Sequence, residues 1–330
     1  MSQSGSPSRV AVMGAGAISQ VVHVPVLSER EDVELVALSD LDEHKAASVA
    51  DRFDVPEALG PDGLLERDDL DSVVICTPNH LHEELAIAAL EAGKHVFVER
   101  PLATSPEGVE RVLEAARKAD GVLVVGLPHR FRPEVAALRS FVAGGELGDI
   151  YAVRGSWLAR QARIVRPGWR QDPEESGGGA LDLCLWTVAF PRIRRVSCQL
   201  RSDEHPVEDS ATLLAVSEEG MAISVEVSNH YFAGQDRYYA RVMGSEGSGS
   251  LPPLEVYRQL GGRPLEVTPN QPRPRGGENP YTTAYRRQID YFLRAVKGQV
   301  EAPLPEEQVS LMALIQAAYR AAESGEEVTL

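Results

Sequence analysis

Lysine is scarce in this chain of 330 residues, which contains only Lys45, Lys94, Lys118 and Lys297. Arginine therefore supplies most of the positive charge, and arginine stays protonated at any physiological pH. A coding bias or adaptation to salt explains the scarcity better than a functional cause does. In either case, few lysine side chains are available to carry a proton in a reaction.

Cysteine is also sparse, and its three copies, Cys76, Cys184 and Cys198, cannot all pair within the chain. Their spacing matches no zinc pattern, so we expect no metal site. Reduced thiols fit a cytoplasmic location. No apolar run approaches the roughly eighteen residues that would span a bilayer, and the polar stretch 1–8 lacks the features of a secretion signal. Neither a membrane span nor export is predicted.

Acidic residues outnumber basic ones, and the formal net charge is −16 at pH 7. Such a chain would be repelled by nucleic acids and by anionic membranes, so we expect neither as a partner. Small molecules remain as the expected binding partners. The content of 43% hydrophobic and 25% charged residues is typical of a globular protein, and the length favours two domains over one.

A dinucleotide-binding pattern opens the chain. The apolar run 10–13 breaks at Gly14 and continues from about Ala17 into a helical pattern. Gly14 permits a tight turn, Gly16 lets the backbone approach a phosphate, and the helix start offers N–H groups to that anion. A second apolar run ends at Asp40, where dinucleotide folds carry the acidic residue that binds the adenine ribose.

Strand-like and helix-like segments then alternate, which predicts a parallel sheet of the Rossmann type, an α/β fold. Because the carboxyl ends of parallel strands share one edge, we expect Gly14, Asp40, Thr77 and Glu99 around one crevice. The predicted strands cover 10–13, 33–38, 71–76, 95–99 and 122–125, and the predicted helices cover 42–51, 83–92 and 106–119, with Gly93 as a C-cap.

The pattern changes after residue 127, so we predict an α/β domain over 1–127 and an α+β domain over 128–330. The stretch 252–280, rich in proline and glycine, is expected to be an irregular, mobile excursion. The predicted helices cover 133–143, 180–190, 282–296 and 306–322, and the main predicted strands, mostly antiparallel, cover 150–157, 211–216, 222–227 and 238–242.

Six short motifs spread over nearly the whole chain carry a family resemblance. They are Gly-Ala-Gly-Ala-Ile at 14–18, Thr-Pro-Asn-His-Leu-His at 77–82, Ala-Gly-Lys-His-Val-Phe-Val-Glu-Arg-Pro at 92–101, Arg-Phe-Arg-Pro at 130–133, Trp-Arg at 169–170 and Gly-Gly-Gly-Ala-Leu-Asp at 177–182. In order and spacing they resemble the Gfo/Idh/MocA oxidoreductases, the family of glucose-fructose oxidoreductase and inositol dehydrogenase.

That resemblance implies a Rossmann domain and a C-terminal domain with a large, mainly antiparallel open sheet that joins copies into a homodimer or homotetramer. It also implies bound NAD or NADP and redox chemistry on sugars, polyols or related compounds. The charge of Asp40 would repel a 2′-phosphate, so NAD is the predicted cofactor. The predicted cofactor-binding residues are Gly14, Gly16, Ala17, Ile18, Asp40, Thr77, Pro78, Asn79, His82, Glu99, Arg100, Trp169 and Arg170.

Two departures from the family pattern fall where its chemistry is normally done. The usual Glu-Lys-Pro triplet has Arg100 in the place of lysine, and Trp186 stands where the family has histidine, four residues after Asp182. Oxidation of a hydroxyl needs a proton acceptor, which neither arginine nor tryptophan provides. The predicted catalytic residues are therefore Asp182 as acid/base, Arg100 as a fixed cation and Trp186 as a flat face for a sugar ring.

Each of these residues also has a plain structural interpretation. Asp182 can cap a helix or pair with an arginine, and Trp186 can fill a core. Histidines at predicted strand ends, such as His80, His82 and His129, can simply satisfy loop hydrogen bonds. An arginine cluster is either a solvated face or a basin for an anionic substrate, and it comprises Arg154, Arg160, Arg163, Arg166 and Arg170. The predicted substrate contacts are His129, Arg163, Asp182 and Trp186.

Three functions follow from this site. The first is an NAD-dependent oxidoreductase acting on a sugar, sugar acid or cyclitol. The second retains NAD, oxidises the sugar transiently, eliminates a substituent and returns the hydride, as a glycosidase-like enzyme. The third is a cofactor-binding pseudoenzyme that serves as a sensor or assembly partner. The losses at Arg100 and Trp186 favour the third, whereas Asp182 and the pair Trp169-Arg170 argue against it.

Overall fold

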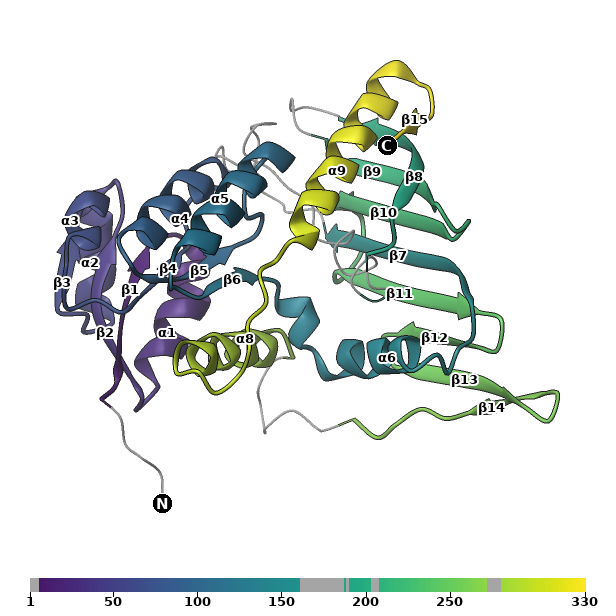
Figure 1. The fold of residues 1–330 in the computed structure, drawn as a ribbon, viewed down its shortest axis with the longest axis horizontal. Coiled ribbons are helices and arrows are strands. Elements are labelled where there is room, and N and C mark those ends of the chain that lie inside the picture. The colour runs from purple at the N-terminus through teal and green to yellow at the C-terminus, as the bar shows by residue number, and fades with distance from the viewer. Residues whose placement is uncertain (1–5, 161–186, 188–189, 203–207, 272–279) are drawn as a thin grey trace. The chain divides into compact units, whose positions relative to one another are not determined.

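The computed structural model describes residues 6–160, 187, 190–202, 208–271 and 280–330 (Figure 1). The chain forms two compact units, and neither is continuous in sequence. The first comprises residues 1–128 and 277–308, and the second comprises 129–276 and 309–330. Each unit has a sheet of its own. None of the helices in the described ranges is long and apolar enough to cross a bilayer.

The first unit is built on a parallel sheet of six strands in the order β3-β2-β1-β4-β5-β6. Its central strands are buried on both faces, as Val10 of β1 and Val73 of β4 show, since neither has exposed surface. The strand order reverses at β1, which pairs with β2 on one side and β4 on the other. The strands are β1 (Ser8–Met13), β2 (Val33–Ser39), β3 (Glu57–Leu59), β4 (Ser72–Ile75), β5 (His95–Glu99) and β6 (Leu123–Gly126).

Local signals explain where the helices of this unit begin and end. The Asp42 carboxylate accepts a hydrogen bond from the Lys45 N–H at 3.1 Å, and the Ser105 hydroxyl accepts one from the Gly108 N–H at 3.0 Å. Gly93, with φ of +73°, follows the last helical turn as predicted. The helices are η1 (Ser19–His23), α1 (Val24–Ser28), α2 (Glu43–Arg52), α3 (Pro61–Leu65), η2 (Asn79–Leu81), α4 (His82–Glu91), α5 (Pro106–Lys118) and α8 (Pro280–Val296).

Helix α8 follows all but the last strand of the second sheet in the sequence but belongs to the first unit. Its Ile289, Phe292 and Leu293 have no exposed surface and share one apolar core with Val10 and Phe97. The rings of Phe97 and Phe292 lie 5.7 Å apart, edge to face. The division of the chain at residue 127, inferred from the sequence, assigned this helix to the second domain. The periodicity of the helix reveals that it has an apolar face, but it does not reveal which surface that face covers.

The second unit has a sheet of nine strands in the order β14-β13-β12-β11-β7-β10-β9-β8-β15. Only β7 and β10 pair in parallel, and every other pair is antiparallel. The predicted fold class, a Rossmann domain with a mainly antiparallel second sheet, is confirmed. The strands are β7 (Ile150–Arg160), β8 (Ile193–Arg201), β9 (Ser210–Ser217), β10 (Ala222–Tyr231), β11 (Arg237–Gly244), β12 (Gly247–Leu251), β13 (Glu255–Leu260), β14 (Arg263–Glu266) and β15 (Val328–Thr329).

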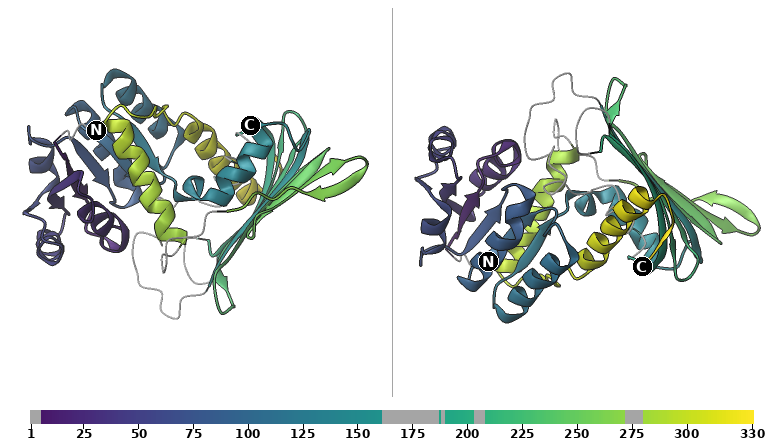
Figure 2. Two further views of the ribbon diagram at one scale, coloured as in Figure 1. Left: turned by 90° about the horizontal axis from the view of Figure 1, so that it is seen from below. Right: turned by 90° about the horizontal axis from the view of Figure 1, so that it is seen from above.

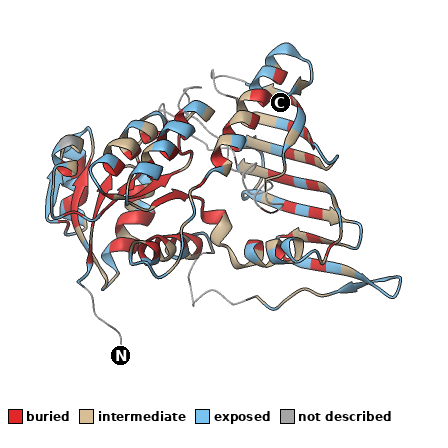
Figure 3. Ribbon diagram, viewed as in Figure 1, coloured by how far each residue is buried: buried red, intermediate tan, exposed pale blue. Residues whose placement is uncertain are grey.

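Burial alternates along these strands (Figure 3). In β9, Leu213 and Ala215 are buried, whereas Leu214 between them is 52% exposed. The buried face packs on Leu138 and Leu314, which belong to helices that both lie on one side of the sheet (Figure 2). These helices are α6 (Pro133–Ala143) and α9 (Glu307–Ser324), and the short helix η3 (Pro128–Phe131) precedes them.

The expectation of an irregular excursion over 252–280 is wrong for residues 255–266. Strands β13 and β14 form a hairpin in which Leu260 pairs with Arg263 across Gly261 and Gly262. Both glycines have positive φ, +59° and +78°, the values of a two-residue turn that matches strand twist. Glycine here closes a hairpin and does not loosen the chain.

Candidate functional site

The glycine turn after β1 has the geometry that the sequence predicts. Gly14 has φ of +100°, and its N–H donates to the Ser39 carbonyl at 2.6 Å. A Cβ on Gly14 would lie 2.6 Å from the Cys76 carbonyl oxygen, so no side chain fits between β1 and the end of β4. Around Gly16 there is space, because a Cβ there would meet only that same oxygen, at 4.0 Å. Helical backbone begins at Ala17, as predicted, and includes Ile18.

Asp40 follows β2 and turns its carboxylate back to the glycine turn. One carboxylate oxygen accepts from the Ala15 N–H at 2.7 Å and from Lys45 Nζ at 2.8 Å, and the other accepts from the Asp42 N–H at 3.0 Å. Partial burial acts to raise the pKa of Asp40, but the hydrogen bonds from Lys45, Asp42 and Ala15 outweigh it and hold that pKa below its usual value. Asp40 is therefore an anion at neutral pH.

We expect Asp40→Ser to narrow the preference for NAD over NADP. The exchange removes hydrogen-bond acceptors for the ribose hydroxyls and a charge that repels a 2′-phosphate, so NAD should bind about tenfold more weakly and NADP more tightly. It also leaves Lys45 without the carboxylate that it contacts, and this cation can then face the phosphate. Calorimetric titration with both dinucleotides measures the effect.

The double variant Asp40→Ser/Lys45→Ala is the matched control, since it removes the cation as well. NADP should bind the double variant more weakly than the single one. Tighter binding of NADP than NAD to the unaltered protein would contradict the assignment of Asp40.

The loop after β4 carries Thr77, Pro78 and Asn79. The Thr77 hydroxyl oxygen is buried and has no hydrogen-bond partner among the described residues. A buried polar atom left in this state destabilises a fold by about 1–3 kcal/mol unless a ligand or water satisfies it. A phosphate oxygen or a ribose hydroxyl would do so at this edge of the sheet.

His82 lies one turn further on and is wholly buried. Its Nδ1 is 2.7 Å from the Pro101 carbonyl and its Nε2 is 2.9 Å from the Thr77 carbonyl, so the ring ties the loop after β4 to the loop after β5. Burial lowers the pKa of His82, although both carbonyls act in the opposite direction. A neutral ring can donate to only one of the two carbonyls.

Glu99 ends β5 and is also buried, with 11% of its side chain exposed. Its carboxylate lies 2.6 Å from the Nε2 of His23, a residue that the sequence analysis did not select. The only signal was a histidine within the apolar stretch 21–26 directly after the glycine turn. Arg100 follows Glu99 and is half-buried. The electrostatic effect of Arg100 reaches Tyr285 of α8, where burial is the main cause of a raised pKa.

The other predicted site residues divide into two groups. His129 belongs to the second unit, where its buried ring meets Trp157 of β7 edge to face at 4.8 Å, and Trp157 in turn stacks on Tyr238 at 5.5 Å. The rest lie outside the described residues, and they are Arg163, Trp169, Arg170, Asp182 and Trp186.

The described residues of the predicted cofactor site lie at one edge of the first sheet. The structure gathers Gly14, Gly16, Asp40, Thr77 and Glu99 at the carboxyl ends of β1, β2, β4 and β5.

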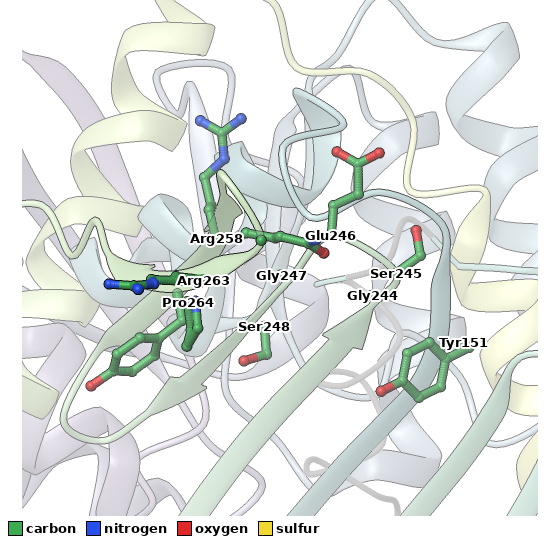
Figure 4. A pocket seen from close by; sticks show the side chains of 12 residues that line it. Tyr151, Gly244, Ser245, Glu246, Gly247, Ser248, Arg258, Arg263 and Pro264 are labelled. Carbon is green, nitrogen blue, oxygen red and sulfur yellow. The ribbon is translucent and has the colours of Figure 1, made fainter.

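A separate hollow of about 380 Å³ lies in the second unit along β11 to β14 (Figure 4). Tyr151, Ser248 and Arg263 are among its lining residues, and none of the predicted site residues is. Arg258, a cation on its wall, already contacts the Glu146 carboxylate at 2.7 Å. The candidate site is therefore the crevice expected at the carboxyl ends of the strands in the first unit, where the predicted residues gather.

The residues of that crevice fit a dinucleotide: a glycine turn without room for a Cβ, open space at Gly16, an anion at Asp40 and an unsatisfied hydroxyl at Thr77. They define the class of dinucleotide-binding Rossmann proteins. Comparison with known families agrees, because residues 8–127 match the model of an oxidoreductase family with an NAD-binding Rossmann fold, Gfo/Idh/MocA, and residues 135–250 match the C-terminal domain of the same family. The chain belongs to the Gfo/Idh/MocA family.

Known relatives are similar over part or nearly all of their length. D-glucoside 3-dehydrogenase of Escherichia coli (strain K12) is 29% identical in an alignment that covers 98% of both chains. Myo-inositol 2-dehydrogenase of Thermotoga maritima is 33% identical over 147 residues, 44% of each chain. Among solved structures, GenD2 from gentamicin A biosynthesis in complex with NAD is 27% identical, with a TM-score of 0.84, and the match covers 100% of this chain and 98% of that one. The predicted family, cofactor NAD and oxidoreductase class are confirmed.

Proposed function

We propose that this protein transfers a hydride between NAD and a hydroxyl or carbonyl carbon of a sugar, sugar acid or cyclitol. The observation that carries the proposal is the similarity to D-glucoside 3-dehydrogenase along 98% of both chains. The name of the Thermotoga maritima relative adds a cyclitol to the substrate class. The close packing at Gly14 and the open space at Gly16, beside the carboxyl ends of the parallel strands, support NAD as the hydride carrier.

In this reaction NAD supplies the carbon that accepts the hydride. Asp40 binds the adenine ribose, and the turn at Gly14 and Gly16 receives the pyrophosphate. Arg100, a permanent cation at the end of β5, stabilises a developing alkoxide without accepting its proton. Asp182 accepts that proton directly or through water. The remaining assignments are Trp186 as a platform for the sugar ring, His129 and Arg163 as substrate contacts, and Trp169 and Arg170 as further cofactor contacts.

The two alternative functions are not favoured. Three relatives from different organisms, two of them matched over nearly their full length, are named as dehydrogenases acting on a glucoside, a xylose and an inositol. A glycosidase-like enzyme would keep NAD bound and return the hydride to the sugar, whereas a pseudoenzyme would transfer no hydride. Both predict no net NADH from any sugar, which separates them from the proposed dehydrogenase.

We also propose a cellular location, an oligomeric state and a division of roles between domains. Cys76 and Cys198 are buried free thiols, which supports a reducing cytoplasm. One face of the nine-stranded sheet bears exposed apolar side chains, including Leu214 at 52% and Tyr239 at 42%, which supports a homodimer or homotetramer through that sheet. The functional division into a cofactor domain over 1–127 and a substrate domain over 128–330 is part of the same proposal, with α8 of the later segment completing the core of the cofactor domain.

The test is an assay of NADH formation with NAD and a panel of glucosides, free sugars, sugar acids and cyclitols, with product analysis in parallel. We expect net NADH and a keto product from at least one of these classes. Loss of a glycosidic substituent without net NADH would show the glycosidase-like reaction. Binding of NAD without conversion of any panel member would favour the pseudoenzyme.

A further inference from the structure

His23 is a buried titratable residue for which the reaction described above has no role. It closes the short helix η1, and its side chain has no exposed surface. Its Nε2 lies 2.6 Å from Oε1 of Glu99. The tautomer with its proton on Nε2 donates to this oxygen, which a carboxylate can accept. A hydrogen bond to a charged acceptor is among the stronger ones in proteins.

The imidazole ring is held by packing from two other elements of the same unit. Phe97 of β5 lies 5.4 Å from it at a tilt, and Tyr285 of α8 meets it edge to face at 5.6 Å. The second ring nitrogen, Nδ1, is buried and has no partner among the described residues. An apolar side chain would fill this position without leaving a polar atom unsatisfied. The hydrogen bond to Glu99 is thus the feature that distinguishes histidine here.

Glu99 is also confined on its other side. A Cβ on Gly126 of β6 would lie 3.0 Å from Oε2 of Glu99, so the absence of that Cβ leaves room for the carboxylate. The charge of Glu99 adds to burial in raising the pKa of the Cys76 thiol at the end of β4. The carboxylate therefore has a defined place between β4 and β6, at the edge of the sheet where the cofactor crevice lies.

The strand order indicates which half of the dinucleotide faces Glu99. Asp40 follows β2 and the glycine turn follows β1, so the adenosine and the pyrophosphate occupy that side of the crevice. Strands β2 and β5 are three steps apart in the order β2-β1-β4-β5, which separates them by roughly 14 Å. A dinucleotide extended across this edge brings its nicotinamide half to the end of β5.

We propose that His23 is a positioning residue for the cofactor. By donating from Nε2 it fixes the Glu99 carboxylate in the orientation that the nicotinamide ribose of NAD meets. The inference rests on the proposed function, because it needs NAD in this crevice. It assigns His23 no contact with NAD itself, so its effect is confined to the part of the cofactor that Glu99 faces.

The experiment compares His23→Leu with His23→Gln by calorimetry, using NAD and ADP as separate ligands. Leucine cannot donate, so His23→Leu should bind NAD about tenfold more weakly, whereas ADP, which lacks the nicotinamide half, should bind as it does to the unaltered protein. The amide of glutamine reaches a similar position and can donate. His23→Gln should therefore recover most of the affinity for NAD.

A purely structural role predicts different results. Equal losses for NAD and ADP, or a lower melting temperature with no recovery in His23→Gln, would overturn the proposal. If His23→Leu does not fold, Glu99→Gln replaces it and should show the same selective loss for NAD; unchanged NAD binding in Glu99→Gln would also overturn the proposal. Failure of the unaltered protein to bind either ligand would instead refute the proposed function.

Discussion

Gly14→Ala should bind NAD at least about a hundredfold more weakly than the unaltered protein. The backbone at Gly14 has φ of +100°, which a residue with a side chain adopts only under strain, and the new Cβ would lie 2.6 Å from the Cys76 carbonyl oxygen. Strain of this kind amounts to about 1–3 kcal/mol before the overlap is relieved. Relief requires the ends of β1 and β4 to separate, which would distort the turn that we propose as the pyrophosphate site. Calorimetry with NAD measures the loss.

Gly16→Ala is the matched control, because its Cβ would meet only the Cys76 oxygen, at 4.0 Å. This variant should fold and melt as the unaltered protein does. Its affinity for NAD should still fall about tenfold, since the methyl group occupies the space through which the pyrophosphate approaches the backbone. Unchanged binding in Gly16→Ala would move the pyrophosphate away from this turn, and unchanged binding in Gly14→Ala would remove the turn from the site altogether.

Arg100→Ala should lower kcat/KM for a sugar-acid substrate by about tenfold to a hundredfold, the range expected for a lost charge-assisted contact. Arg100 follows the buried Glu99 at the carboxyl end of β5, and its charge does not vary with pH. Arg100→Lys should also weaken sugar-acid binding, because lysine cannot present two parallel donors to a carboxylate. Steady-state kinetics with NAD across neutral polyols and sugar acids measure both effects.

The two variants separate a specialised site from a decayed one. Arg100→Lys should gain a dependence of kcat/KM on pH that the unaltered protein lacks, since a lysine at this position can exchange a proton. If Arg100→Lys instead raises turnover of neutral sugars while the unaltered protein converts no substrate, the arginine marks lost chemistry, and the pseudoenzyme replaces the dehydrogenase as the function of this chain.

The cofactor side of the site was predictable from the sequence because each of its residues stands where a strand ends. Gly14 and Asp40 follow short apolar runs, and parallel strands bring their carboxyl ends to one edge whatever the loops between them contain. His23 was missed for the opposite reason. Its partner Glu99 is seventy-six residues away, and no spacing rule connects a helix-borne histidine with a strand end at that distance.

The second unit was less predictable in its details. Alternating apolar and polar residues predicted the strands β7, β9, β10 and β11. The hairpin of β13 and β14 was missed because its glycines and prolines are also typical of irregular loops. The parallel pairing of β7 with β10 depends on contacts between residues about seventy positions apart. The sequence expresses the pattern of each strand but not its neighbour, which is chosen by tertiary packing.

The place of α8 has a consequence for how the chain matures during synthesis. The core of the dinucleotide-binding unit includes Ile289, Phe292 and Leu293, which leave the ribosome after every strand of the second sheet except β15. A nascent chain that ends before residue 280 exposes the apolar surface around Phe97 that Phe292 later covers. The core of this unit can therefore close only after nearly all of the chain has emerged.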